Sequence, residues 1–206
     1  MSERQFPPQA MTSNTSDMSS ASYGKGSYIE SASSETSENT RAYKAFDWRT
    51  ESGLWHSVNT RSTGEPQWIR LDMPVPIRVT RYVLHSRNHP DVADADFPNS
   101  FRLQGSNDAS SWTDLDTRDD QASSITNPLT RKEYSVNTKS SFSKYRLYVS
   151  NVGLDGKGRG EGDRQYTVLG QFELYGVIHK DRTTLYLIIG GVVSLLLLLT
   201  IVFNML

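Results

Sequence analysis

The feature that most constrains the fold is a series of short stretches, between residues 27 and 178, in which apolar and polar side chains alternate. Successive side chains of a strand point to opposite faces, so this alternation predicts half-buried β-strands. Residues 68–73, 101–104 and 145–149 are the clearest examples. Breaks rich in proline or glycine separate the stretches, and no apolar periodicity of helix length interrupts them. The pattern predicts an all-β domain, folded as an antiparallel β-sandwich.

Charge and cysteine content argue against several classes of function. The chain carries 22 Lys and Arg against 23 Asp and Glu, so it has no strong field to attract nucleic acid. It has no cysteine, which excludes a disulfide framework, a thiolate metal cluster and a cysteine nucleophile. The four histidines show no metalloprotease spacing, and the glycine-rich residues 156–162 do not open a helix as a phosphate loop would. We therefore expect a protein that is not an enzyme and does not bind nucleic acid.

The two ends of the chain differ from its middle. Residues 1–26 are rich in Ser and Thr and poor in large apolar groups, so burial would not offset the entropy lost on ordering them. We predict a disordered arm there. Residues 183–206 carry no charge, and a helix of about 20 apolar residues spans the hydrocarbon core of a bilayer. We predict a juxtamembrane linker at residues 179–184 and a transmembrane helix at residues 185–206.

The residues beside the predicted span indicate its orientation. Lys180 and Arg182 precede it and no basic residue follows it, so the positive-inside rule places the folded head on the cytoplasmic side. The first residues lack the basic start and apolar run of a secretory signal. The sequence therefore predicts a single-pass membrane protein with a C-terminal anchor.

Five fragments of the middle region occur in a characteristic order. They are AYKAFDWRTESGLWHS, PQWIRLDMPVPIRVTRYVLHSRN, FPNSFRLQGSNDASSWTDLDTR, FSKYRLYVSN and LGQFELYG. In this order they resemble the discoidin family, also called the coagulation factor type C domain. The resemblance covers nearly all of residues 27–178. It implies a discoidin-like, eight-stranded antiparallel jelly-roll sandwich, and it says much less about the ligand.

Several of these residues also have direct physical roles. Trp55 and Trp68 are large apolar side chains that suit the ends of a sandwich core. Residues 106–108 supply side-chain oxygens for a tight turn. Ala109 stands where the family usually has glycine, and alanine is disfavoured at positive φ, so we expect a different type of turn.

The resemblance implies ligand-binding loops at one end of the sandwich, which correspond to residues 34–40, 48–54, 87–97 and 151–166. Sugar-binding relatives combine an aromatic plate with Arg, His and acidic groups, because a pyranose has an apolar C–H face and hydroxyls in fixed directions. We therefore predict a glycan site at this end. Its candidate residues are Trp48, Arg49, Arg87, Asn88, His89, Asp91, Arg159 and Tyr166.

Two of these candidates also have a purely structural interpretation. Arg87 can close the end of a strand by pairing with Asp91 or Asp96. His89, which precedes a proline, can be an ordinary turn residue. The sequence leaves both interpretations open.

The resemblance also implies a structural calcium ion, which many relatives hold through the Asp of the Ala-Phe-Asp segment and a Glu before the final strand. Asp47 matches the first position, but Gln171 stands at the second. Calcium takes six to eight oxygen ligands and favours carboxylates, so this departure argues against the ion. Arg49 can occupy the space instead, and we expect no other cofactor.

Two functions are compatible with these features. The first is a membrane-anchored recognition protein whose head binds a glycan or a glycan-bearing partner. The second follows from the fragments VLHSRN, GSND and LDTR, which are similar to discoidin-like proteins of large DNA viruses. It is a structural protein that tethers a capsid protein to the internal membrane of a virion. A homo-oligomer is compatible with either function.

Overall fold

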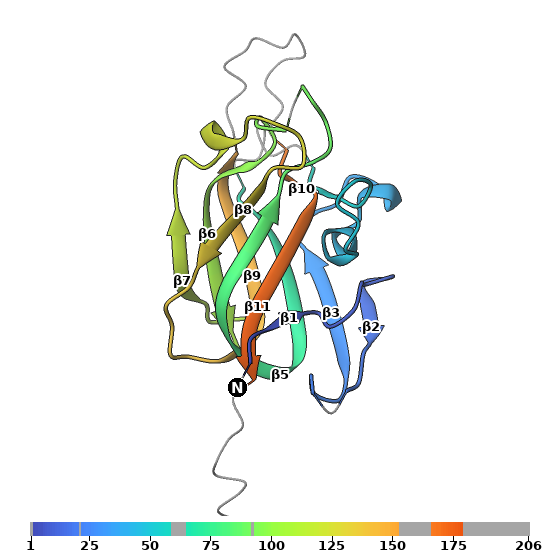
Figure 1. The fold of residues 1–206 in the computed structure, drawn as a ribbon, viewed down its shortest axis with the longest axis vertical. Helices are drawn as coiled ribbons and strands as arrows, with labels where there is room; N and C mark the ends of the chain where they lie inside the picture. Colours follow the sequence, from blue (N-terminus) through green and yellow to red (C-terminus); the bar gives the residue numbers. More distant parts are fainter. Residues whose placement is uncertain (1, 21, 59–64, 92, 153–165, 179–206) are drawn as a thin grey trace, which may run out of the picture.

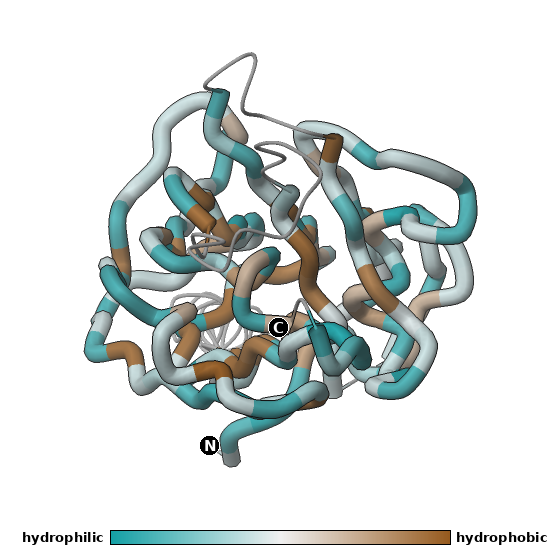
Figure 2. Tube along the Cα trace, turned by 90° about the horizontal axis from the view of Figure 1, so that it is seen from above, coloured by the Kyte–Doolittle hydropathy of each residue, from teal (hydrophilic) through white to brown (hydrophobic). Residues whose placement is uncertain are grey.

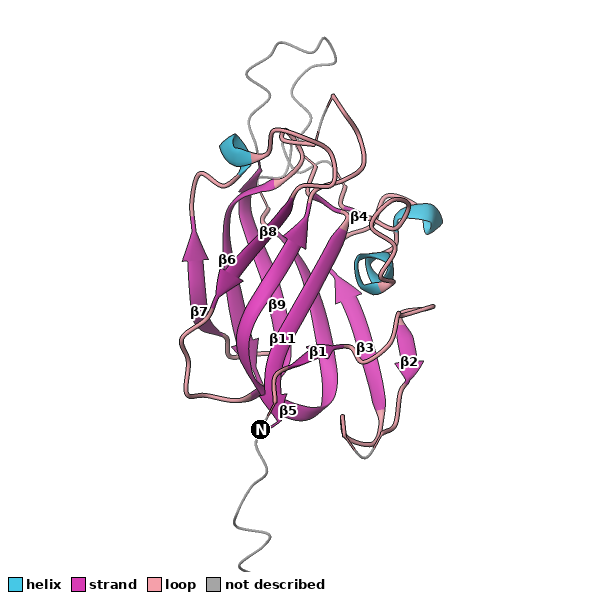
Figure 3. Cartoon of the chain, viewed as in Figure 1, coloured by secondary structure: helices cyan, strands magenta, loops and turns pink. Residues whose placement is uncertain are grey.

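The computed structural model describes residues 2–20, 22–58, 65–91, 93–152 and 166–178. These residues form β-strands with a few short 3-10 helices, which confirms the predicted all-β sandwich (Figure 3). Within these ranges, no helix is long and apolar enough to cross a membrane. The predicted linker and transmembrane helix, residues 179–206, lie outside the described residues.

The described residues form eleven strands and three 3-10 helices. The strands are β1 (Arg4–Phe6), β2 (Thr15–Asp17), β3 (Ser27–Ala32), β4 (Trp55–His56), β5 (Gln67–His85), β6 (Pro98–Ser106), β7 (Thr113–Arg118), β8 (Arg131–Ser135), β9 (Phe142–Val152), β10 (Val168–Leu169) and β11 (Gln171–Ile178). The 3-10 helices are η1 (Glu38–Thr40), η2 (Ala42–Phe46) and η3 (Ala122–Ser124).

Strand β5 organises the sandwich because its two halves pair with different neighbours. Residues 67–72 pair with β9 and, in part, with β3, whereas residues 77–85 pair with β11 and, in part, with β8. The register breaks between these halves, where two prolines cannot donate to the ladder. One layer therefore has the order β2-β3-β5-β9-β6-β7 and the other β1-β11-β5-β8, with β5 curving between them (Figure 1). Without β1, β2 and the two-residue strands β4 and β10, seven strands remain. Counting the two halves of β5 as separate strands gives the eight that were predicted.

The core lies between the layers, and Figure 2 shows hydrophobic stretches gathered toward the interior. Tyr82 of β5 connects the two layers, because its ring stacks on Tyr134 at 4.9 Å between centroids and meets Phe101 of β6 edge-on at 6.4 Å. Its hydroxyl donates a 2.7 Å hydrogen bond to Asp116, so the buried phenol is satisfied. The apolar positions predicted from the alternation are all buried, namely Ile69, Leu71, Met73, Phe101, Leu103, Tyr145, Leu147, Val149, Phe172 and Leu174.

The two tryptophans that the sequence predicts as core anchors have different environments. Trp55 is fully buried, and its indole N–H donates a 2.9 Å hydrogen bond to the Ser34 carbonyl. Trp68 is only partly buried, and the Arg70 guanidinium lies 5.7 Å from its ring centroid. The prediction for Trp68 was wrong because this residue occupies the outward-facing phase of β5, where a cation covers its ring.

The N-terminal arm, which the sequence predicts to be disordered, is folded against the sandwich. Strand β1 pairs with β11, and β2 pairs with β3. Phe6, Met11 and Met18 are buried in the same core as the predicted strands. The prediction of disorder from the Ser and Thr content was wrong, because three apolar side chains and the unpaired edges of β3 and β11 are enough to hold the arm.

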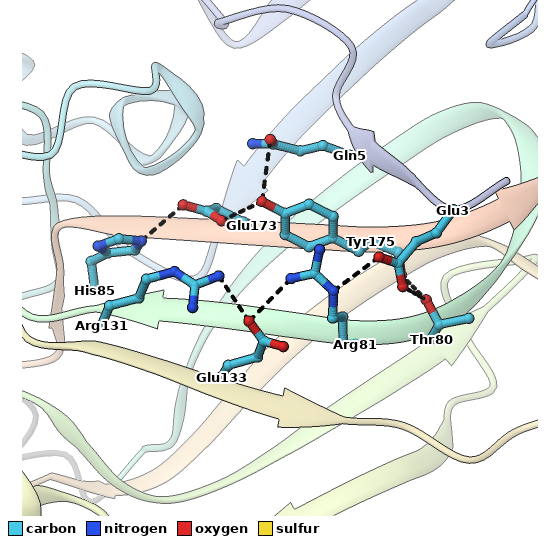
Figure 4. A network of polar contacts seen from close by, with 9 residues as sticks. All are labelled: Glu3, Gln5, Thr80, Arg81, His85, Arg131, Glu133, Glu173 and Tyr175. Carbon is cyan, nitrogen blue, oxygen red and sulfur yellow. Dashed lines mark hydrogen bonds and ion pairs between the residues drawn. The ribbon is translucent and has the colours of Figure 1, made fainter.

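Polar contacts fasten the arm to the outer face of the second layer (Figure 4). Glu3 pairs with Arg81 of β5 at 3.0 Å, and Gln5 accepts a 3.3 Å hydrogen bond from the Tyr175 hydroxyl. The Arg81 guanidinium lies 3.5 Å from the Tyr175 ring centroid and also pairs with Glu133 at 3.2 Å. The network therefore joins β1, β5, β8 and β11 across one face.

The turn between β6 and β7 also differs from expectation. Ala109 has φ of 63°, the left-handed conformation that glycine favours. The Ser106 hydroxyl accepts a 3.0 Å hydrogen bond from the Ala109 N–H, and Asp108 accepts 2.8 Å bonds from two following amides. These bonds hold the alanine in a conformation that is unfavourable for a residue with a Cβ atom.

Candidate functional site

The loops that follow η2 and β5 lie at the same end of the sandwich, at the top of Figure 1. Trp48 follows η2 and is 46% exposed, the most exposed of the large apolar side chains in the described residues. Its φ is 60°, an uncommon conformation for a residue with a large side chain. A residue other than glycine keeps this left-handed conformation only where surrounding contacts fix its backbone, and such residues are common at functional sites.

The surroundings of Trp48 explain its conformation. Its backbone N–H donates a 3.0 Å hydrogen bond to the side-chain oxygen of Gln171. The chain then turns back, with the Gly53 N–H bonded to the Arg49 carbonyl at 2.8 Å. A Cβ at Gly53 would collide with an Asp47 carboxylate oxygen, so a larger residue there would displace this carboxylate from its hydrogen bonds. The loop is thus closed on itself and presents the indole to solvent.

Arg87 lies two residues after the end of β5 and forms an ion pair with Asp96 at 2.7 Å. Both side chains are largely buried, with 20% and 14% of their surfaces exposed. Burial raises the pKa of Asp96, and the Arg87 guanidinium opposes this rise. The structural interpretation of Arg87 is therefore confirmed for Asp96, and the pair fixes the base of the 87–97 loop.

His56 and Tyr166 form an aromatic pair beside this ion pair. Their ring centroids are 4.6 Å apart with an angle of 52° between the planes. Burial lowers the pKa of His56, so its imidazole is neutral at pH 7. Asp96 and Arg87 are close enough to His56 to influence its pKa in opposite directions. Tyr166 could be predicted from the sequence, whereas His56 could not, because it reaches the site through the pairing of β4 with β10.

Three other candidates lie on the loop that follows β5. Asn88 donates a 3.4 Å hydrogen bond to the Glu51 carbonyl and so connects this loop to the Trp48 loop. The Nδ1 atom of His89 accepts a 3.2 Å bond from the Asp91 N–H, which supports the interpretation of His89 as a turn residue. Asp91 is exposed beyond this turn.

Two candidates remain. Arg159 lies outside the described residues, so its prediction stays untested. Arg49 has an exposed side chain, and the hydrogen bond that it makes to Asp47 comes from its backbone N–H, 2.9 Å from the carboxylate. Its guanidinium does not fill the space beside Asp47, because the Gln171 amide lies there, 2.9 Å from the same oxygen.

The residues around Asp47 do not fit the calcium ion that the resemblance implies. The group that faces the Asp47 carboxylate from β11 is the amide N–H of Gln171, a donor that a cation would repel. Burial raises the pKa of Asp47, and hydrogen bonds from Arg49 and Gln171 oppose the rise. Among the residues that the structure describes, no group of three or more His, Asp or Glu side chains is placed to hold a metal ion.

The fold is a β-sandwich, and the loops at one end carry an exposed tryptophan and a largely buried ion pair. Residues 29–143 match the F5/8 type C domain family, a stretch that covers more than half of the chain. The chain therefore belongs to the F5/8 type C, or discoidin, family. A comparison with curated proteins found no match.

Several solved structures share the fold at low sequence identity. A family 32 carbohydrate-binding module from a family 31 glycoside hydrolase of Clostridium perfringens is 17% identical, with a TM-score of 0.56, over 71% of this chain and 88% of the module. The family 32 module of NanJ from the same organism, solved with galactose, is 14% identical, with a TM-score of 0.52, over 72% and 93%. The lectin domain of lectinolysin, solved with Lewis B antigen, is 16% identical, with a TM-score of 0.52, over 70% and 89%.

Proposed function

We propose that this protein is a non-enzymatic recognition module that binds a glycan, or a glycan-bearing partner, at the loop end that carries Trp48. The observation that carries the proposal is the exposed indole, held by its neighbours at positive φ. Nearly half of this side chain is exposed, which leaves a flat apolar surface for the C–H face of a sugar.

Polar groups on the loops at the same end of the sandwich suit the hydroxyls of the same ligand. Arg87 and Asp96 supply donors and acceptors in fixed positions, because each holds the other. Neutral His56 donates its Nδ1–H to the Ser57 carbonyl at 2.9 Å, which leaves Nε2 as an acceptor, and its ring packs at an angle against Tyr166. Galactose and Lewis B antigen are bound by structural neighbours of the same fold, which supports a sugar as the ligand class.

Replacing Trp48 by alanine should weaken glycan binding about five- to thirtyfold, because one stacking contact is worth roughly 1–2 kcal/mol. Binding of the labelled full-length chain to a glycan array, in a detergent without a sugar headgroup, measures the effect. Ile29→Ala is the matched control, since Ile29 is 43% exposed but lies on β3. This control should bind as the unchanged protein does. Absence of array binding by the unchanged chain, or equal losses in both variants, would refute the proposal.

We propose further that residues 185–206 anchor the head to a membrane, with the head on the cytoplasmic side. The support is the run of 24 uncharged residues that follows Arg182. Protease treatment of intact cells should leave the head uncut, and cutting should follow permeabilisation. Cleavage of the head on intact cells would place it outside and contradict the orientation. Co-purification of the chain with a shell protein from virus particles would instead favour the tether between capsid and membrane.

A further inference from the structure

Gln171 occupies an unusual position for an uncharged polar side chain. It is the first residue of β11 and only 1% exposed, in contact with the segment that leads into the Trp48 loop. Its side-chain nitrogen donates to the Lys44 carbonyl at 3.0 Å and to the Asp47 carboxylate at 2.9 Å. Its oxygen accepts from the Trp48 N–H at 3.0 Å. One side-chain amide therefore makes hydrogen bonds to Lys44, Asp47 and Trp48.

These three contacts fix the orientation of the amide. The two N–H groups face two acceptors, and the oxygen faces a donor. Rotating the amide by 180° would set oxygen against oxygen at Lys44 and Asp47, and N–H against N–H at Trp48. The amide also contributes the bond that satisfies the Trp48 backbone in its left-handed conformation. The contacts thus explain why an exposed indole is held in a costly backbone geometry.

We propose that Gln171 is the positioning residue of the Trp48 loop. Its side-chain amide links β11 to the loop through hydrogen bonds, in place of the link that a bound calcium ion would make. A cation between β11 and Asp47 would need oxygen ligands from both sides, but the β11 side presents an N–H group. The conformation of the loop is therefore independent of calcium. The inference rests on the proposed function only where it concerns glycan binding by Trp48.

The substitution Gln171→Glu tests the inference because it changes one donor group into a carboxylate of the same size. The new charge would face Asp47, and the Lys44 carbonyl would lose its donor. The melting temperature of the full-length protein in detergent should fall by about 5–10 °C at pH 7 in EDTA. The unchanged protein should melt at the same temperature in EDTA and in millimolar calcium chloride, because a bound ion would raise it. Gln9→Glu, at an exposed site on the arm, is the matched control and should not shift the melting temperature.

A spectroscopic measurement separates positioning from general stability. In protein labelled with ¹⁵N-tryptophan, Gln171→Glu should move the Trp48 indole resonance and leave those of Trp55, Trp68 and Trp112 in place. A calcium-dependent melting temperature of the unchanged protein would overturn the inference. So would a Gln171→Glu variant as stable as the unchanged protein, or an unmoved Trp48 resonance. None of these measurements uses a glycan, so they remain decisive if glycan binding fails. Glycan binding that requires calcium would overturn this inference and leave the proposed function standing.

Discussion

Replacing Glu30 by glutamine should raise the free energy of unfolding by about 3 kcal/mol at pH 7 and by less than about 1 kcal/mol at pH 4.5. Glu30 lies on β3 and is 2% exposed, and neither of its carboxylate oxygens has a hydrogen-bond partner of normal geometry in the structure. Burial raises its pKa to about 8, and the charge of Glu35 adds to the rise. The Tyr43 backbone N–H and the Arg70 guanidinium offset part of it.

The direction of this pH dependence follows from the pKa of Glu30 in the unfolded and in the folded chain. The unfolded chain releases this proton near the ordinary pKa of 4.5, whereas the folded chain keeps it up to about pH 8. The stability contributed by the protonated group is therefore complete below about pH 4.5 and is lost as the pH rises toward 8. Glutamine cannot ionise, so the variant should lose this part of the pH dependence.

Urea denaturation followed by tryptophan fluorescence, at pH 4.5 and pH 7, measures the effect. Glu38→Gln makes the same chemical change at a side chain that is 89% exposed, and it should change stability by less than about 0.5 kcal/mol at either pH. An equal gain for Glu30→Gln at both pH values would show that the ionisation of Glu30 does not limit stability.

Replacing Arg87 by alanine should lower the free energy of unfolding by about 2–4 kcal/mol at pH 7, because it leaves the Asp96 carboxylate buried without its cation. The pKa of Asp96 is already raised by burial and should rise further when Arg87 is removed. In the variant, stability should therefore be regained as the pH falls and Asp96 becomes protonated. Urea denaturation at pH 4.5 and pH 7 checks this difference.

A second substitution provides the control for this result. Asp96→Asn in the Arg87→Ala background removes the stranded charge and should recover part of the lost stability at pH 7. If the loss caused by Arg87→Ala is the same at both pH values, and Asp96→Asn recovers nothing, Arg87 stabilises the loop through packing and not through its charge.

Much of the fold could be predicted because strand alternation is a local property. Ile69 is buried and Arg70 is only partly buried, because successive side chains of a strand point to opposite faces, as the alternation predicted. The arm could not be predicted in this way. Its order depends on Phe6 and Met11 entering a core built by strands far away in the sequence, and on a strand edge that no local pattern reveals.

The site was predictable only in part for the same reason. Trp48 and Arg87 could be proposed from their positions relative to the fragments of the family. His56 could not, because it reaches Tyr166 through the pairing of two short strands. Gln171 was identified as a departure from the family, but its three hydrogen bonds depend on how β11 meets the segment after η2.

Glycan binding at the Trp48 end of the sandwich can be tested most directly by titrating the ¹⁵N-tryptophan-labelled full-length chain with the glycan that binds most strongly on the array. The chain has four tryptophans, and each reports on a different place in the fold. We predict that the Trp48 indole resonance shifts with added glycan and that the resonances of Trp55, Trp68 and Trp112 stay in place. Saturable binding with a shift at Trp68 or Trp112 and none at Trp48 would show that the glycan binds elsewhere on the fold.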